Sequence, residues 1–334
     1  MTHKNRNTLI IGLIVGIILL AAWLYYTPIS EIRTQIAKVN YNWVIFASLA
    51  YLFAYFLRSL RWRLLLPAQA NPGICRTWLY SMAGNLLNYL IPIRAGDFAR
   101  GWFIKKNYDI PYAKALPSVF VDKVFDTLAI LFIIIVLPFT TIELSTAMII
   151  LLCLLMLVFI VAFSILVASV WQKEWVIKML TFIFSWLPQK AKDRINPAIE
   201  MFIEELNIFE HQPLKLILAL LLTAFGILMD GTYFYLLFRA FGILYPFAIT
   251  LFGYTLINLS YAIPQPPAQL GSNEWMMIII FSIGFGLTKT TASAIMAFGH
   301  ILTAGLMSLW GIIAFAVLGP ELFISVFKGE KIND

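Results

Sequence analysis

The chain has 334 residues, of which 61% are hydrophobic and only 12% are charged. A soluble domain has about 25% charged residues, so the polar side chains here are too few to cover a water-facing surface. The long apolar runs predict an all-α integral membrane protein, because a helix satisfies its own backbone hydrogen bonds when lipid surrounds it.

Basic residues exceed acidic ones and give a net charge of +7. In a membrane protein this excess is typical of cytoplasmic loops, so we expect no nucleic-acid partner. The two cysteines and three histidines are scattered along the chain, with no spacing typical of a metal site or a disulfide framework. We therefore expect no metal site and no other cofactor.

The first apolar run, residues 8–26, follows Lys4 and Arg6. It is long and has no clear cleavage site, so we interpret it as an uncleaved first span with a cytoplasmic amino terminus rather than a signal peptide. Residues 27–41 are predicted to form a short external loop or an interfacial helix.

The second span, at about residues 43–66, ends with Arg58, Arg61 and Arg63 around Trp62. Arg58 and Arg61 are three residues apart and share one helix face. We interpret the three arginines as a cytoplasmic rim. Two roles remain open for this rim: a positive flank that orients the span, or a surface that attracts phosphate groups.

The first interrupted segment, residues 76–91, is at or below the length needed to cross a bilayer. It ends at Pro92, and the polar sequence Arg94-Ala95-Gly96-Asp97 precedes a short helix to Ile104. Several lysines that follow indicate the cytoplasmic side again. The segment is therefore predicted to enter and leave the membrane on one side, as a re-entrant hairpin.

Residues 112–137 are predicted to form the third full span, and residues 146–170 an uncharged fourth span that faces lipid. Residues 171–212 follow as a cytoplasmic amphipathic connector, in which apolar side chains recur at helical spacing. Helices of this kind pack on their own bundle or lie at the membrane interface more often than they bind a partner.

The second half of the chain has a similar order of segments. A fifth span at residues 214–238 is followed by a short apolar segment, residues 246–263, that ends at the proline-rich run Pro264–Pro267. Residues 275–287 are again too short to cross a bilayer. The sequence thus predicts a second re-entrant hairpin.

The last span, residues 290–318, contains His300, and one acid, Asp230, lies inside the fifth span. Together these segments predict about six full spans and two re-entrant hairpins in a single transmembrane domain over residues 1–334. We expect a multi-pass protein of the cell membrane, specifically the inner membrane, with both termini in the cytoplasm.

The two interrupted segments resemble each other. Asn88-Tyr89-Leu90-Ile91-Pro92 matches Ser260-Tyr261-Ala262-Ile263-Pro264, and each is followed by a glycine and then an acid. Three full spans separate them, so the second enters from the opposite face. This pattern predicts an inverted repeat with halves at residues 41–137 and 213–318 and a site near the midplane. Chance similarity between apolar segments is the alternative.

Breaks in the two hairpins are expected at Gly96, at Gly271 and in the proline-rich run. Ionisable residues at membrane depth are expensive, so they face a partner, a cavity or a pathway. The predicted substrate-binding residues are Asn85, Asn88, Arg94, Asp97, Arg100, Asp122, Lys123, Asp126 and Glu274. The alternative is that these charges neutralise one another and only hold the hairpins in place.

Arg94 and Arg100 offer planar donor forks that suit phosphate. Asp122 and Asp126 are one helical turn apart, and Lys123 points about 100° away from Asp122. Two like charges at that spacing require cationic partners where water is scarce. The sequence therefore predicts Arg94 or Arg100 as the partner of one acid, and the other acid as a group that takes up a proton during transport.

Four motifs carry a family resemblance: Arg-x-x-Arg-Trp-x-x-Leu-Leu at 58–66, Asn85…Pro92-x-Arg94-x-Gly96-Asp97-x-x-Arg100, Asp122-Lys123-x-x-Asp126 and Gly271-x-x-Glu274. With these motifs nearly the whole chain resembles the lysylphosphatidylglycerol synthase transmembrane family, also called the flippase-like or UPF0104 family. That family more often has Glu-Arg at Asp122-Lys123 and Glu at Asp97.

The resemblance implies a translocase for polar lipids or lipid-linked intermediates. Family members that transfer amino acids carry a large extra soluble domain. We expect no such aminoacyl-transferring domain in this sequence, so lipid synthesis is not implied.

We therefore expect a translocase rather than an enzyme. An anionic or polar head group of a lipid or lipid-linked substrate crosses through a polar cavity between the two hairpins, while its tails remain in lipid. A homo-oligomer is left open. One alternative is a membrane-embedded enzyme acting on a lipid phosphate, although no metal triad or histidine-based acid–base pair supports it. The other is an ion-coupled transporter of a small solute.

Overall fold

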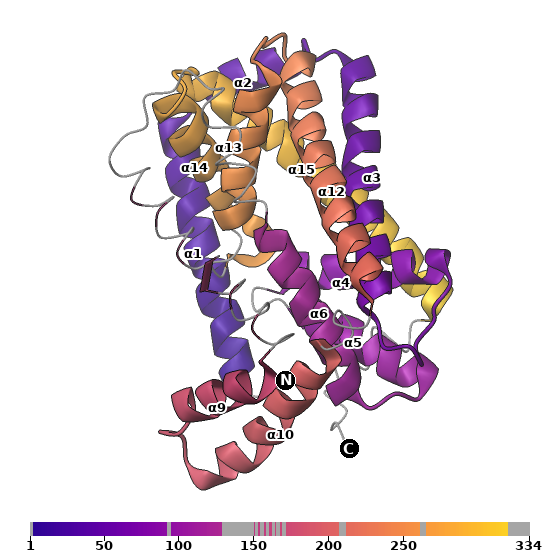
Figure 1. Cartoon of the computed structure of the whole chain (residues 1–334). Helices are drawn as coiled ribbons and strands as arrows, with labels where there is room; N and C mark the ends of the chain where they lie inside the picture. The colour runs from indigo at the N-terminus through magenta and orange to yellow at the C-terminus, as the bar shows by residue number, and fades with distance from the viewer. Residues whose placement is uncertain are drawn as a thin grey trace.

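The computed structural model describes residues 3–91, 95–128, 172–206, 212–260 and 265–319, and single positions between 150 and 168. Every regular element in these residues is helical, and Figure 1 shows the helices as one elongated bundle. The described part of the chain is therefore an all-α membrane protein, as its composition predicts.

Three helices are long and apolar enough to cross a membrane: α3 (Tyr41–Leu65), α12 (Pro213–Ala240) and α15 (Lys289–Leu318). Two of them begin at capped residues, since the Asn40 side chain accepts from the Asn42 amide and Thr288 from the Thr291 amide. Within the described residues these helices form the core of a multi-pass arrangement.

A further span is bent. Helix α1 (His3–Tyr26) meets the short helix α2 (Ile29–Ile36) at 87°, and α2 packs against α15. Residues 27–41 thus contain the short helix that was one of the two expectations for them. Helix α1 begins and α15 ends at the same end of the molecule (Figure 1). Which end faces the cytoplasm stays a prediction.

The first interrupted element is a hairpin of α4 (Ile74–Leu90) and α5 (Ala95–Tyr108). Gly96 is the second residue of α5, so it follows the break instead of forming it, which differs from the expectation. Its role is close packing: a Cβ at Gly96 would lie 1.8 Å from the Gly84 carbonyl oxygen of α4. The chain between the helices includes Pro92 and Arg94, which lie outside the described residues.

Helix α6 (Tyr112–Thr127) follows and packs against α5 and α3. The remainder of the predicted third span, and the predicted fourth span apart from single positions, lie outside the described residues. In the connector, α9 (Lys173–Ile183) and α10 (Gln189–Leu206) are helices, and α10 packs against α6. The described part of the connector thus joins the bundle through its apolar face.

The second interrupted element comprises α13 (Phe247–Ser260), the turn η2 (Pro267–Gln269), α14 (Ser272–Met277) and the π-helical η3 (Ile278–Ile283). Gly271 precedes α14 with φ +74°, and a Cβ there would lie 2.5 Å from the Leu20 backbone nitrogen of α1. Only glycine fits both constraints without strain. Gly271 therefore acts at a break, as expected.

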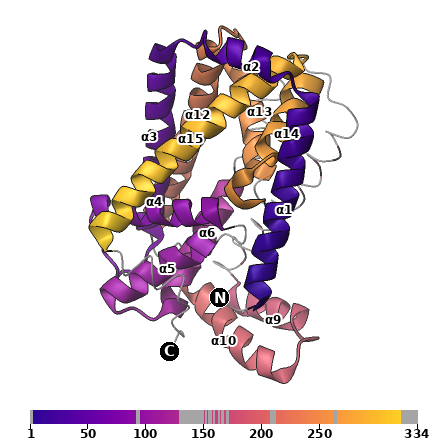
Figure 2. The ribbon, with the colours of Figure 1, turned by 180° about the vertical axis from the view of Figure 1, so that it is seen from behind.

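The two interrupted elements occupy opposite ends of the bundle. Figures 1 and 2 show α4 and α5 in the half that holds α9 and α10, and α13 and α14 in the half that holds α2. Helix α12 packs along α3, and α15 packs against α4. Re-entrant insertion from opposite membrane faces, the inverted repeat and the six spans stay predictions.

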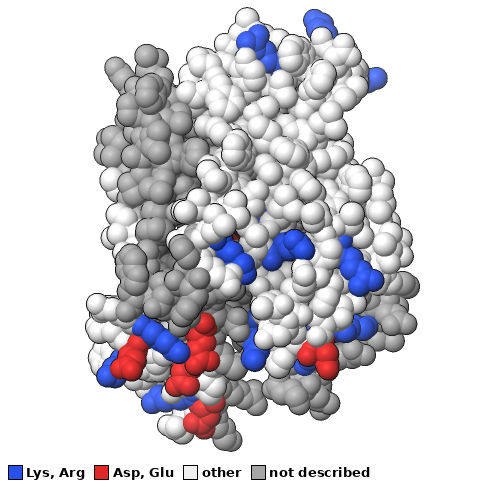
Figure 3. Space-filling view, turned by 45° about the vertical axis from the view of Figure 1, so that its right-hand side comes forward, with Lys and Arg blue, Asp and Glu red and all other residues white. Residues whose placement is uncertain are grey.

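Acidic side chains on the face shown in Figure 3 gather at one end, whereas basic side chains are spread more widely. The acidic residues and many basic ones lie toward the end that holds α9 and α10, and further basic ones lie at mid-height and at the opposite end of a wide face that is mostly uncharged. A wide uncharged face of this kind suits contact with lipid. The fold thus positions charged groups inside a bundle that is largely uncharged on this face.

Candidate functional site

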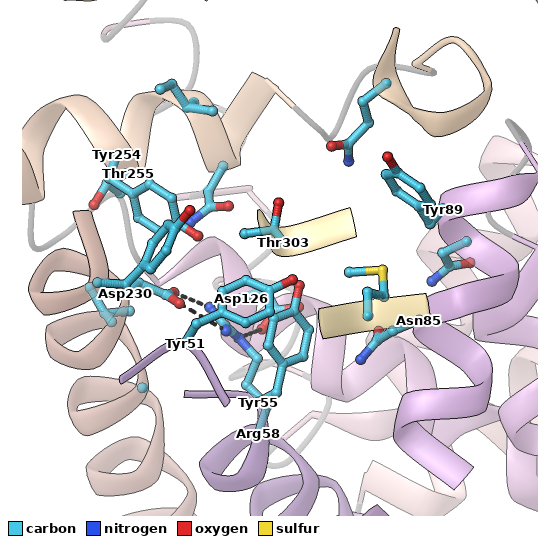
Figure 4. Close-up of a pocket in the computed structure, with 18 of the residues that line it drawn as sticks. Tyr51, Tyr55, Arg58, Asn85, Tyr89, Asp126, Asp230, Tyr254, Thr255 and Thr303 are labelled. Carbon is cyan, nitrogen blue, oxygen red and sulfur yellow. Dashed lines mark hydrogen bonds and ion pairs between the residues drawn. The ribbon is translucent and has the colours of Figure 1, made fainter. Parts of the chain in front are cut away.

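A cavity of about 460 Å³ lies between the long helices and the two interrupted elements. Its lining residues come from both halves of the chain, including α3, α4, α6, α12, α13 and α15. Figure 4 shows Arg58, Asp126 and Asp230 together on one side of the cavity, with Asn85 and Tyr89 on another.

The cavity lies far from the ends of the helices that form it. At 1.5 Å per residue, Asp230 is about 25 Å from the first residue of α12 and about 15 Å from the last. By the same rise, His300 is about 16 Å from the start of α15 and about 27 Å from its end. Because α12 and α15 are long enough to cross a bilayer, these polar groups lie at membrane depth.

Three buried charged residues, Arg61, Arg100 and Asp122, form what we call the buried ionic core. The Arg61 Nε donates to Asp122 Oδ1 at 2.8 Å, and the Arg100 Nη2 donates to Asp122 Oδ2 at 2.9 Å. Arg61 also donates to the Thr223 hydroxyl of α12 at 3.1 Å, and Arg100 stacks 4.1 Å from the Trp62 ring centroid. The core thus joins α3, α5, α6 and α12.

Three further side chains, Arg58, Lys123 and Asp126, are the cavity-facing ions, with side-chain exposures of 25%, 31% and 33%. Asp126 accepts from the Arg61 Nη2 at 2.6 Å and from the Lys123 Nζ at 3.3 Å, and its Oδ1 is 3.9 Å from the Arg58 Nε. Arg58 pairs through both terminal nitrogens with Asp230 of α12. These cations keep part of their surface open to the cavity.

The tip of the first hairpin is tied to this network. The Asn88 Nδ2 donates to Asp97 Oδ1 at 3.0 Å, and the Asp97 amide donates back to Asn88 Oδ1 at 3.2 Å. The Lys123 Nζ lies 3.4 Å from the same Asp97 oxygen. Asp97 therefore connects α4, α5 and α6 at the edge of the cavity.

The network is electrically balanced over the described residues, with four cations and four carboxylates: Arg58, Arg61, Arg100 and Lys123 with Asp97, Asp122, Asp126 and Asp230. Part of it fits the alternative that the charges neutralise one another, since Arg61, Arg100 and Asp122 of the buried ionic core lie in the cavity wall with side chains only 2–5% exposed. The cavity-facing ions differ because an entering anion can reach them.

A second polar cluster joins the two interrupted elements across the cavity. The His300 Nδ1 lies 2.7 Å from Glu274 Oε1 of α14, and the His300 Nε2 lies 3.1 Å from the Tyr89 hydroxyl of α4. The same Nε2 is 2.8 Å from the Ala268 carbonyl oxygen of η2. Glu274 Oε2 is buried and has no hydrogen-bond partner among the described residues.

Four tyrosines form another wall. The rings of Tyr51 and Tyr55 lie 4.8 Å apart, Tyr51 lies 5.4 Å from Tyr233, and Tyr233 lies 5.8 Å from Tyr254. The lining also carries neutral hydrogen-bonding side chains from both halves: Ser81, Asn85, Asn88, Thr223, Thr255, Asn258, Gln265, Gln269, Asn273 and Thr303. Such a lining suits a ligand with several hydroxyl groups more than a purely apolar one.

The structure brings together most of the residues that the sequence selects. Asn85, Asn88, Arg100, Asp122, Lys123 and Asp126 line the cavity, Asp97 binds Asn88 at its edge, and Glu274 lies behind His300. Arg94 lies outside the described residues, so its expected role as a partner of the acids stays a prediction.

The three arginines expected at a cytoplasmic rim do not all lie together, because they project from different faces of α3. Arg58 and Arg61 share a face of α3 and point into the cavity wall, where Arg61 is almost fully buried. Arg63 turns away and donates to the Pro72 carbonyl oxygen at 2.7 Å and to Asn71 at 2.8 Å. The reason is that acids on α6 and α12 face the first two and solvate them in place of water.

Sequence reasoning missed two participants. Asp230 holds Arg58, and His300 joins both hairpins, yet neither was assigned to the site. The available signal was the rule that a lone ionisable residue inside an apolar span faces a partner or a cavity. Among the residues that the structure describes, no group of three or more His, Cys, Asp or Glu side chains is placed to hold a metal ion.

The sequence matches a known protein family over most of its length. The model for the lysylphosphatidylglycerol synthase transmembrane region matches residues 9–311, almost the whole chain. The chain belongs to this family. The match includes both interrupted elements and all the cavity-lining residues described above.

Two similar proteins of this family type cover nearly the full length. A UPF0104 membrane protein of Methanocaldococcus jannaschii is 22% identical over 329 residues, covering 93% of this chain and 95% of that protein. One from Methanothermobacter thermautotrophicus is 23% identical over 351 residues, covering 100% and 99%. Both relatives are named as membrane proteins, and each aligns with this chain over nearly its whole length.

A third similar protein is named for an activity. Glycosyltransferase AglD of Haloferax volcanii is 30% identical over 130 residues, which cover 38% of this chain and 20% of that protein. The alignment thus spans only a small part of that relative. No solved structure matches the chain.

Proposed function

We propose that the protein is a translocase that moves the polar or anionic head group of a lipid or lipid-linked molecule across the membrane without changing it chemically. The observation that carries this proposal is a polar cavity at membrane depth in which Arg58 and Lys123 keep part of their surface exposed. Buried ionisable groups at such depth typically mark a pathway.

An anionic head group would compete with Asp126 for its cationic partners. Lys123 and Arg58 both lie beside Asp126, at 3.3 and 3.9 Å, and neither pair is sealed from the cavity. A phosphate oxygen that enters here takes the place of the Asp126 carboxylate beside Arg58 and Lys123. Both cations therefore keep an anionic partner while they are shielded from water. Replacing Asp126 by the head group should therefore cost little electrostatic free energy.

The size and lining of the cavity support a head group rather than a whole lipid. A volume of about 460 Å³ falls in the usual range of small-molecule sites, about 300–1,000 Å³, and leaves no room for acyl tails. The tyrosines and neutral polar side chains suit hydroxyl groups such as those of glycerol or a sugar. The tails would stay in lipid while the head group crosses.

We further propose that the six spans and the two hairpins form an inverted repeat, in which rocking of one half against the other exposes the cavity to each side in turn. Single cysteines in a Cys75→Ser, Cys153→Ser background test this arrangement. Membrane-impermeant reagents should label Gly73→Cys and Gly242→Cys from opposite sides of intact cells, with Gly73 on the cytoplasmic side. Labelling of both from one side contradicts the proposed topology.

The transport prediction uses Lys123→Gln in proteoliposomes that contain fluorescent phosphatidylglycerol labelled on a tail. Loss of one charged contact should slow head-group crossing about tenfold, equivalent to about 1.4 kcal/mol. The matched control is Lys173→Gln, because Lys173 is also partly exposed and pairs with one acid, Glu204, at 3.2 Å outside the cavity. Its rate should equal that of the parent.

Two results would contradict the translocase proposal. If the parent moves neither this probe nor a fluorescent glycolipid faster than empty liposomes, no lipid passes through the cavity. If the probe is recovered with an altered head group, the protein is an enzyme. This alternative is tested because the similar protein AglD is named a glycosyltransferase. Mass spectrometry of the recovered lipid separates these cases.

A further inference from the structure

The second polar cluster stands apart from the arginine–aspartate network and has a different chemistry. His300 on α15 lines the cavity, while Glu274 on α14 lies behind it, with side-chain exposures of 9% and 6%. The titratable groups that face this pair are Tyr89 from α4 and Tyr233 from α12, whose hydroxyl donates to the Gly299 carbonyl oxygen at 3.4 Å. No cation pairs with Glu274 among the described residues other than His300 itself.

The contacts fix the number of protons in the pair. A carbonyl oxygen can only accept, so the His300 Nε2 that lies 2.8 Å from the Ala268 oxygen carries a hydrogen. The His300 Nδ1 lies 2.7 Å from Glu274 Oε1, and two lone pairs cannot face each other at that distance, so a second hydrogen lies between them. The pair thus holds one proton more than a neutral imidazole beside an ionised carboxylate.

From this geometry we propose that His300 and Glu274 form a proton-binding site, filled from the cavity past Tyr89, whose occupancy drives head-group movement. The proton count rests on the side-chain contacts alone. The coupling to movement rests on the proposed function. The ligand of this site is therefore a proton, and the protein would be a proton-coupled lipid translocase.

Loss of the proton must break one of the two contacts of the ring. If the remaining hydrogen stays on Nδ1, the bare Nε2 faces the Ala268 oxygen and accepts from Tyr89 instead, so α15 exchanges a contact with η2 for one with α4. If it stays on Nε2, the contact with Glu274 becomes repulsive. Either way the two hairpins change how they are held together.

The strained backbone of η2, next to the pair, can change conformation when these contacts change. Ala268 and Gln269 adopt φ values of +53° and +55°, which are unfavourable for residues with a side chain. Their positive φ persists only while neighbouring contacts hold it. The bond from His300 to the Ala268 oxygen is one of these contacts, so η2 is free to relax when the proton leaves from Nε2 and the remaining hydrogen stays on Nδ1.

Proton occupancy can be measured without any transport. We would use ¹⁵N-histidine-labelled full chain in lipid nanodiscs, with His3→Gln and His211→Gln so that His300 gives the only histidine signal. At pH 7.5 a free histidine is about 90% neutral. The parent should instead show both ring nitrogens protonated, or an infrared band of a protonated carboxyl that Glu274→Gln removes. A neutral ring with no such band at this pH overturns the proposal.

Coupling is measured as the steady-state distribution of the fluorescent phosphatidylglycerol across proteoliposomes with an imposed pH gradient. At one proton per head group, each pH unit should shift the distribution by up to about tenfold. Glu274→Gln and His300→Gln should abolish this shift. The matched control Glu204→Gln, an exposed acid of α10, should retain it.

The outcomes separate this inference from the proposed function. A parent that moves the probe but ignores the gradient overturns proton coupling and leaves translocation intact. A parent that moves no lipid contradicts the proposed function, and the occupancy measurement then decides alone whether the proton site exists. Should His300→Gln fail to fold, Glu274→Gln carries the test, because a glutamine still accepts from Nδ1.

Discussion

Arg61→Gln should lower the free energy of unfolding by about 3–5 kcal/mol, because removing one partner of a buried ion pair leaves uncompensated charge in a dry site. The Arg61 side chain is 2% exposed and makes hydrogen bonds to Asp122, Asp126 and Thr223. A neutral glutamine cannot satisfy both acids. Unfolding by denaturing detergent in mixed micelles would measure the loss.

Arg63→Gln is the matched control, since it makes the same chemical change two residues along the same helix. Arg63 contacts only the Pro72 carbonyl oxygen and Asn71 among the partners described, and part of this contact is exposed. Exposed polar contacts contribute less than about 1 kcal/mol. If Arg61→Gln is no more destabilising than Arg63→Gln, the buried ionic core does not hold α3, α5 and α6 together.

The general architecture could be predicted from the sequence because it depends on composition and on the lengths of the apolar runs, which do not require knowledge of how the helices pack. A low charged fraction requires lipid, and an apolar run shorter than about 20 residues cannot cross it as a helix. These two constraints predict the long helices α3, α12 and α15 and the two interrupted elements, each within a few residues of the bounds in the structure. At the second interruption, Gly271 with its φ of +74° supplies a local reason for the break.

Gly96 shows where this local reasoning ends. A glycine beside a predicted break is easily interpreted as its cause, yet Gly96 lies inside α5 and permits contact with Gly84 of α4. A close approach between two helices depends on how they pack, and one sequence does not specify the crossing point. The same sequence signal therefore fits two different roles.

The partners within the site could not be predicted for a related reason. The sequence shows that Asp122 and Asp126 need cations, but it does not show how α3 is rotated against α6. The structure gives Asp122 two arginines, Arg61 and Arg100, and gives Asp126 contacts with Arg61 and Lys123. Each acid thus has cationic partners within the described residues, and the expectation that one of them takes up a proton loses its motivation.

Asp122→Asn and Asp126→Asn should differ in kind. Asp122 is 3% exposed and accepts from both arginines of the buried ionic core. Asp122→Asn leaves these two buried cations without their shared carboxylate, so it should lower the free energy of unfolding by about 3–5 kcal/mol. Asp126 is 33% exposed and faces the cavity. Its asparagine still accepts a hydrogen bond from Arg61, so Asp126→Asn should fold with a loss of about 1 kcal/mol or less.

Asp126→Asn, which should change stability little, should change transport strongly. In Asp126→Asn, Arg58 and Lys123 lose the carboxylate with which an entering anion competes, so an anionic head group should bind more tightly and leave more slowly. Its half-saturating concentration should fall, and its maximal rate should fall with it, since affinity gained in the bound state raises the barrier to release. Titration of the fluorescent phosphatidylglycerol in proteoliposomes measures both quantities. If Asp126→Asn behaves like the parent in both, the head group does not meet Arg58 and Lys123, and the passage for the substrate lies elsewhere than beside Asp126.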